Sequence, residues 1–327
     1  KMGIYGLMRT MIFLGAPSMI WAEVLVISGI AAGILGVLFA IAQHDLKRLL
    51  AYHSVENIGI ILLGFGIGLV GVNRHAPLLA CLGLGGALLH VLNHSIFKGL
   101  LFLGAGSVQH ACHTLEIDEL GGLNKRMPWT TVCFITGATA ICGLPPLNGF
   151  VSEFLIYAGA FNGNINLAML TAWPLIAALA ALALIGGLAA ACFAKVCGIV
   201  FLGRGRSRPA REANEAGLPM RSAMAILSAA CLAIGLGAPL MVHLIQAPLI
   251  LLVPGMNLTP ALNTTTMLLT GTAMFSTALL ICAGIIFLGR SALLSRRKVT
   301  TAATWDCGYL FPSERMQYTA SSFAAPI

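Results

Sequence analysis

The chain of 327 residues consists largely of apolar side chains, with 58% hydrophobic residues, 9% charged residues and a mean hydropathy of +0.91. A soluble domain carries about 25% charged residues, so the composition excludes a soluble domain and indicates an integral membrane protein. The net charge of +8 does not indicate nucleic-acid binding. The basic residues lie in short connections between apolar runs, where they set the orientation in the membrane.

The nine cysteines are scattered along the chain, mostly inside apolar runs, and none of them has C-x-x-C spacing. That pattern favours small packing residues over a metal or redox site. We therefore expect this chain to hold no cofactor and no metal. The sequence begins at Lys1 rather than at a methionine, from which we expect a piece of a longer protein that begins inside a helix.

Apolar runs divide the sequence into eight predicted membrane segments, because a span needs about 20 apolar residues. The expected fold is an all-α polytopic transmembrane bundle over residues 1–290, with broken helices, followed by a cytoplasmic tail or connection over 291–327. The eight segments cover approximately 1–15, 22–44, 50–72, 77–107, 129–161, 168–202, 222–253 and 265–289.

Basic residues are strongly biased to one side of this topology. Alternate connections and the tail hold fourteen Lys and Arg residues, whereas the opposite side holds only Arg74. The positive-inside rule assigns the basic side to the cytoplasm. The basic residues on that side are Lys47, Arg48, Lys125, Arg126, Arg204, Arg206, Arg208, Arg211, Arg221, Arg290, Arg296, Arg297, Lys298 and Arg315.

Two segments are expected to be discontinuous. In 129–161, Pro145 and Pro146 remove backbone donors, and Gly149 follows, so the helix is predicted to open there. An opened helix at mid-membrane must line protein or a wet cavity. The alternative is a proline kink whose freed groups bond to neighbouring helices. Segment 77–107 is too long for one straight span and contains several glycines and Asn93, which favours a local unwinding there.

His90, His94 and Lys98 recur every fourth residue within one apolar segment. A step of four residues turns an α-helix by about 400°, so these side chains lie along one face. Ionisable groups inside membrane spans usually face a polar interior and carry function. A proton relay is therefore the leading hypothesis. The alternatives are structural hydrogen bonding for His90, snorkelling of Lys98 to the interface, and a metal site, for which no third ligand lies nearby.

Glu153 lies in the apolar stretch that follows the proline pair. A buried carboxylate needs a cationic partner, water or a bound proton, so Glu153 is a candidate proton carrier. The alternative is a structural ion pair with a lysine of another span. His53 and Glu56, three residues apart near a cytoplasmic end, could form a proton entrance or a hydrogen-bonded pair at the interface. We expect Lys195, close to the Arg204 loop, to snorkel.

Three stretches resemble, in the same order, motifs of the antiporter-like membrane subunits shared by respiratory complex I, Mrp cation/proton antiporters and membrane-bound hydrogenases. They are 45–59 (DLKRLLAYHSVENIG), 94–102 (HSIFKGLLF) and 143–153 (GLPPLNGFVSE). Residues 52–59, 305–309 (WDCGY) and 318–323 (YTASSF) further resemble the hydrogenase-4 and formate hydrogenlyase branch. Many complex I subunits have His at the position of Asn57, whereas here Glu56 lies beside it.

The resemblance implies that the chain corresponds to the second half of such a subunit. It matches Lys1 to a mid-membrane lysine of the family, His94 and Lys98 to the charged positions of a later helix, and Glu153 to the last charged position. It also implies a proton-translocating, non-catalytic subunit of a bacterial inner-membrane complex. Nickel–iron and iron–sulfur centres are then expected in partner subunits. The alternatives are an Mrp-type Na⁺/H⁺ antiporter subunit and a quinone oxidoreductase subunit.

Overall fold

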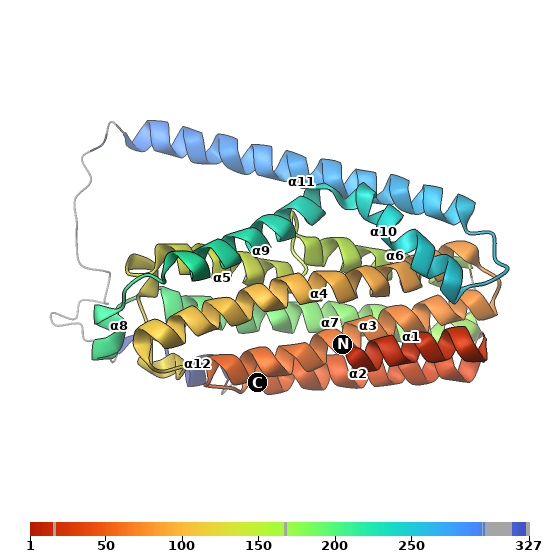
Figure 1. The fold of residues 1–327 in the computed structure, drawn as a ribbon, viewed down its shortest axis with the longest axis horizontal. Helices are drawn as coiled ribbons and strands as arrows, with labels where there is room; N and C mark the ends of the chain where they lie inside the picture. The colour runs from red at the N-terminus through yellow and green to blue at the C-terminus, as the bar shows by residue number, and fades with distance from the viewer. Residues whose placement is uncertain (16–17, 167–168, 296, 298–315, 325–327) are drawn as a thin grey trace.

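A computed structural model describes residues 1–15, 18–166, 169–295, 297 and 316–324 of the chain (Figure 1). Nearly all of these residues are helical, and their only β-type pairing is an isolated bridge between Asp45 and Glu116. The predicted all-α class is confirmed. The 305–309 motif and the basic residues Arg296, Lys298 and Arg315 lie outside the described residues.

The long helices run side by side in one bundle, and α11 lies along its edge (Figure 1). Six stretches are long and apolar enough to cross a bilayer: α2, α3, α4, Trp173–Phe201, α9 and α11. The principal helices are α1 (Met2–Leu14), α2 (Met19–Ile41), α3 (Leu46–Asn73), α4 (Pro77–Cys112), α5 (Pro128–Ile141), α6 (Asn148–Asn166), α7 (Met169–Val196), α9 (Leu218–Leu236), α10 (Met241–Leu252) and α11 (Thr259–Leu294). Short elements are η1 (Ile117–Glu119), η2 (Leu123–Lys125), the π-helical η3 (Cys197–Phe201), α8 (Arg208–Glu212), η4 (Ala238–Leu240) and α12 (Ala320–Ala324).

The predicted opening of segment 129–161 is confirmed. α5 ends at Ile141 and α6 begins at Asn148, with the proline pair between them. Gly149 makes this geometry possible, because a Cβ at this position would lie 1.8 Å from the backbone oxygen of Ala140. The two half-helices therefore contact each other through backbone atoms, and no larger residue fits there.

The predicted unwinding of segment 77–107 is wrong. α4 is one continuous helix from Pro77 to Cys112. Its glycines serve close packing: a Cβ at Gly83 would lie 2.3 Å from the Gly68 nitrogen of α3, and one at Gly86 would lie 2.7 Å from Ile156 of α6. Small residues let membrane helices approach at the backbone, and here they do so without opening the helix.

A second discontinuity occurs where the sequence had predicted one unbroken segment. α9 ends at Leu236, η4 forms a single turn, and α10 begins at Met241. Pro239 lies inside the turn, and Gly235 precedes it. This break packs against the first one, because a Cβ at Gly235 would lie 1.9 Å from the Pro146 oxygen.

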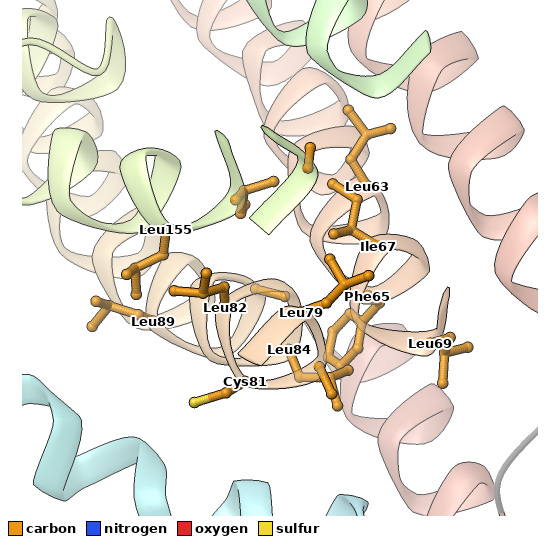
Figure 2. Close-up of a cluster of buried hydrophobic side chains, with 14 of the residues drawn as sticks. Leu63, Phe65, Ile67, Leu69, Leu79, Cys81, Leu82, Leu84, Leu89 and Leu155 are labelled. Atoms are coloured by element: carbon orange, nitrogen blue, oxygen red, sulfur yellow. The ribbon is translucent and has the colours of Figure 1, made fainter. Parts of the chain in front are cut away.

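The largest hydrophobic core lies where α3, α4 and α6 meet (Figure 2). Phe65 and Ile67 of α3, Leu82 and Leu84 of α4, and Leu155 of α6 are almost completely buried there. By contrast, large apolar side chains along the second half of α11 are exposed, including Ile285 and Phe287. In a bilayer such exposure is expected, because lipid tails are as apolar as the side chains.

Three connections meet at one end of the bundle, which we name the Arg-rich end: 42–45, 113–127 and 202–217. They hold Lys125, Arg126, Arg204, Arg206, Arg208 and Arg211, and Lys47 and Arg48 lie in the first turn of α3 beside the first of them. Leu46 donates its backbone N–H to Leu115 (3.0 Å), and Gly122 donates to Leu202 (2.8 Å). The Asp45 side chain caps α3 by accepting from the Arg48 N–H (2.8 Å). These contacts agree with the alternation of sides that the charge bias predicted.

Candidate functional site

Three ionisable residues of α4, spaced four residues apart, are buried inside the bundle. His90 is 0%, His94 3% and Lys98 6% exposed. Their rings and stems follow one face of a continuous helix, and the His90 and His94 rings lie nearly parallel with centroids 6.4 Å apart. The structure therefore brings the predicted stripe together in a location screened from lipid and water.

His90 connects three helices through both of its ring nitrogens. Its Nε2 is 3.1 Å from the Asn57 Oδ1 of α3, and its Nδ1 is 3.0 Å from the Ser152 Oγ of α6. A neutral imidazole donates through one nitrogen and accepts through the other. Both alternatives raised for His90 remain open, because the same bonds can fix the ring or carry a proton.

A cluster of small polar side chains extends from His90 to the start of α6. Asn93 Nδ2 donates to the Asn148 backbone oxygen (2.7 Å) and to Ser152 Oγ (3.0 Å). Asn148 Nδ2 in turn donates to Asn93 Oδ1 (3.3 Å). The sequence analysis did not place these residues in the site. Their signal was present as isolated amides inside apolar segments, where a polar group needs a buried partner.

His94 differs from His90 in its hydrogen bonding. Both of its ring nitrogens are buried without a protein hydrogen-bond partner among the described residues. The ring lies edge-on to Phe97, with centroids 5.4 Å apart. Unpartnered buried nitrogens are costly, and no protein hydrogen bond among the described residues fixes the His94 ring; its assignment to a proton relay stays a prediction.

Lys98 does not snorkel to the membrane surface. Its ammonium donates to the Leu50 backbone oxygen of α3 and lies 5.6 Å from the Phe102 ring centroid. The lysine head is therefore enclosed by protein on the side of the bundle that leads toward the Arg-rich end.

His53 and Glu56 form a hydrogen-bonded pair within α3, as one of the two alternatives predicted. The pair does not lie at an interface, because both residues are 0% exposed and the His53 ring stacks on Phe193 of α7 at 4.7 Å. His53 Nε2 and Glu56 Oε1 have no partner among the described residues. The burial of the pair corrects the expected interfacial position.

Glu153 lies in the first turns of α6, at the break. Its carboxylate sits against Gly143, where a Cβ would lie 2.3 Å from Oε2. No ion pair with Lys98, or with another cation within 4 Å, occurs in the described part of the chain. The ion-pair alternative is thus not supported, and Oε1 has no hydrogen-bond partner there.

Lys1, an exposed residue at the start of α1, contacts α4 beside the histidines. Its Nζ donates to the Val91 backbone oxygen (2.7 Å), one residue beyond His90 on α4. The N-terminus lies part-way along the bundle rather than at an end (Figure 1). The structure therefore places the Lys1 ammonium next to the turn of α4 that carries His90, and the mid-membrane role that the resemblance implies for Lys1 stays a prediction.

Lys195 does not reach the interface as expected. It is 1% exposed, and its ammonium donates to the backbone oxygens of Ile41 (2.5 Å) and Gln43 (3.0 Å). These oxygens lie at the end of α2, where carbonyls lack helical partners and a cation is favoured. Lys195 thus caps the carbonyl end of α2.

Residues 1–179, more than half of the chain, match the family described as "NADH:quinone oxidoreductase/Mrp antiporter, TM". The chain belongs to this family. The match includes both half-helices of the first break and the whole of α4. The resemblance stated from the three sequence motifs is confirmed.

Two relatives from Escherichia coli (strain K12) are similar over nearly the whole chain. "Hydrogenase-4 component B" is 40% identical over 94% of this chain and 48% of its own length. "Formate hydrogenlyase subunit 3" is 38% identical over 100% of this chain and 52% of its own length. The chain thus spans about half the length of these relatives.

A solved structure, the "membrane-bound sulfane sulfur reductase (MBS), an archaeal respiratory membrane complex", contains a chain of similar fold. It superimposes with a TM-score of 0.70 at 22% identity, covering 93% of this chain and 47% of that one. At this identity the likeness supports the fold, including the polytopic helical bundle described above.

Proposed function

We propose that this family member is a proton-translocating membrane subunit of an energy-converting hydrogenase, of the formate hydrogenlyase or hydrogenase-4 type. The observation that supports it most is the series of buried ionisable groups, His90, His94 and Lys98 of α4 with Glu153 at the helix break, beside which Lys1 bonds to Val91. The similarity to the two Escherichia coli relatives favours the hydrogenase type. Ionisable groups enclosed in a membrane protein are retained where they move charge.

Proton movement along α4 would involve two histidine rings, one of them fixed by hydrogen bonds and the other not. His90 is held by Asn57 and Ser152, so it can pass a proton only if its ring exchanges donor and acceptor roles. His94 has no such restraint, and its ring can turn between His90 and the Lys98 side. Glu56 and His53 continue the series toward the Arg-rich end, and Glu153 ends it at the break.

The energy needed for such switching is modest. Moving one proton against 100 mV costs about 2.3 kcal/mol, and one pKa unit corresponds to about 1.4 kcal/mol. A change of about two units in the proton affinity of one carrier therefore suffices. Moving a neighbouring charge, or opening a carrier to water, changes proton affinity by that amount.

Electron transfer belongs to other subunits in this proposal. The described residues contain no group of three or more His, Cys, Asp or Glu arranged for a metal, and we assign no catalytic residue to the chain. Nickel–iron and iron–sulfur centres would lie in a peripheral hydrogenase arm. The complex as a whole would be anchored in a bacterial inner membrane. Redox energy would reach this chain through its contacts with neighbouring membrane subunits.

The test measures proton uptake coupled to hydrogen evolution in inverted membrane vesicles. Glu153→Gln and Lys98→Ala should each remove coupled uptake while hydrogen evolution by the peripheral arm continues. Glu212→Gln is the matched control, because this carboxylate pairs with Arg208 on the surface and should leave uptake unchanged. Full coupled uptake in both site variants would refute proton translocation through this site.

The second candidate is an Mrp-type Na⁺/H⁺ antiporter subunit, which the family description includes; a quinone oxidoreductase subunit falls under the same description. The Na⁺ dependence of proton uptake distinguishes the hydrogenase subunit from the antiporter subunit. Uptake that stops when Na⁺ is withdrawn from both sides of the vesicle, without any co-purifying hydrogenase, would favour the antiporter. Co-purification of quinone reductase activity would favour the third assignment.

A further inference from the structure

A hollow of about 320 Å³ opens at the Arg-rich end, between the loop after α4 and the loop after α7. Its volume lies within the range of small-ligand sites. Four of its lining residues are basic, and none of its lining residues in the described chain is acidic: Lys125, Arg126, Arg204 and Arg211. None of these four residues belongs to the proposed proton path along α4.

Glycines give the hollow its shape. Gly122 (φ 64°) and Gly203 (φ 76°) adopt left-handed conformations that favour glycine. A Cβ at Gly122 would lie 3.0 Å from the Gly203 oxygen. The two loops thus meet backbone to backbone, and the missing side chains leave space between them. The Gly122 N–H bond to Leu202 fixes this contact.

The carboxylates nearest to the hollow in the chain, Glu212 and Glu215, are bonded elsewhere, and Asp118 lies 3.0 Å from the His44 Nδ1 and 3.9 Å from the Arg206 guanidinium. Glu215 caps α5, accepting from the Trp129 N–H (2.8 Å) and the Thr130 hydroxyl (2.6 Å). Glu212 pairs with Arg208 at 2.9 Å. Lys125, Arg126 and Arg204 form no ion pair within the described part of the chain, so the hollow keeps a concentrated positive charge.

The hollow also lies at the ends of long apolar helices. α5 begins at Pro128, two residues after Arg126, and the spanning stretch Trp173–Phe201 ends two residues before Gly203. Two large apolar side chains beside it are exposed, Trp129 at 58% and Leu202 at 54%. Tryptophan is enriched at membrane interfaces, where its ring meets the headgroups.

We propose that this hollow binds a phosphate-bearing anion at the membrane surface, supplied by an anionic lipid headgroup or by free phosphate. Guanidinium and ammonium groups are the preferred partners of phosphate oxygens. Basic pockets on the cytoplasmic side of membrane helices recognise anionic headgroups in this way. The proposal is independent of proton translocation, because it involves different residues and a different end of the bundle.

The experiment uses the full-length protein in nanodiscs. One arm compares phosphatidylcholine discs with and without phosphatidylglycerol, and counts the phosphatidylglycerol molecules retained after extraction by native mass spectrometry. The other arm titrates inorganic phosphate into phosphatidylcholine discs and measures binding by calorimetry. The pocket variant is Arg126→Gln/Arg204→Gln. Its control, Arg208→Gln/Arg290→Gln, removes the same charge from residues that do not line the hollow.

The pocket variant should weaken binding at least about tenfold, because it removes two cations and each strengthens the binding of an anionic headgroup severalfold. The control variant should leave binding unchanged. Selective loss of retained phosphatidylglycerol assigns the site to lipid, and selective loss of phosphate binding assigns it to the free anion. Equal effects of the two double variants, or no binding in either arm, would overturn the proposal.

Discussion

The chain interrupts two of its membrane segments, and the two breaks differ in chemistry. Between α5 and α6 the break holds Glu153 against Gly143 and hydrogen-bonds to α4 through Asn148. Between α9 and α10 the break contains Gly235 and Pro239 but no carboxylate. The two contact each other directly at the Pro146 oxygen.

The comparison shows that an opened helix is not by itself a functional site. Both breaks free backbone groups inside the bundle, and both depend on glycine for close approach. Only the first presents an ionisable side chain next to the polar face of α4. We therefore treat the α9–α10 break as support for the first one, and the predictions below separate these roles.

The largest expected effect is on folding at the first break. Gly149→Ala would place a methyl group 1.8 Å from the Ala140 oxygen, so we expect the free energy of unfolding to fall by about 3 kcal/mol. Thermal unfolding of the purified protein measures this loss. Gly186→Ala in α7 is the control, since nothing lies within 4 Å of its Cβ position. Equal melting temperatures for the two variants would contradict the packing described here.

The next effect separates stability from transport. Gly143→Ala would add a Cβ 2.3 Å from the Glu153 carboxylate at a residue with φ of 61°. We expect a stability loss of about 1 kcal/mol from the left-handed backbone and a much larger loss of proton uptake. Gly255→Ala, at φ of 85° with no atom within 4 Å, has the same strain without the contact. Uptake lost equally in both variants would exclude a specific role for the carboxylate.

The two histidines of α4 should differ in stability. His90→Leu leaves the Asn57 and Ser152 side chains without their shared partner, whereas His94→Leu breaks no protein hydrogen bond. We expect His90→Leu to lower the free energy of unfolding by about 2 kcal/mol more than His94→Leu. Chemical unfolding in detergent measures the difference. A larger loss for His94→Leu would show that its nitrogens have protein partners.

The smallest effect is expected at the second break. His243 is the ionisable residue of α10 and is exposed. His243→Gln should change the free energy of unfolding by less than about 0.5 kcal/mol and leave proton uptake at the wild-type rate. A loss of uptake comparable to that of Glu153→Gln would place the second break in the transport path and remove the distinction drawn above.

Hydropathy and charge were sufficient for the architecture. The helices of the predicted segments and the opening at Pro145 and Pro146 follow from local composition and are present in the structure, and six stretches of the described residues are long and apolar enough to cross a bilayer. The α9–α10 break was missed although Gly235 and Pro239 carried the same kind of signal. The glycines of α4 led to the wrong prediction of a local unwinding, because Gly83 and Gly86 pack against neighbouring helices instead of opening their own helix.

The residues of the site could be predicted from the sequence, but the groups that they contact could not. Spacing of four residues placed His90, His94 and Lys98 on one face, because the helix period is a local property. Which group each of them contacts depends on the approach of α3 and α6, which no local pattern encodes. Lys195 shows the same limit, because its position in the sequence did not reveal that its ammonium would donate to the backbone oxygen of Ile41 at the end of α2.

By itself, the sequence determined that this protein lies in a membrane, which side is basic, where one helix opens and which residues are ionisable inside it. These properties depend on transfer from water to lipid and on backbone geometry, which act residue by residue. Only the tertiary structure decided that His90 is bonded on both sides, and that within the described ranges His94 has no hydrogen-bond partner and Glu153 no ion pair. Those outcomes depend on distances between helices far apart in the chain.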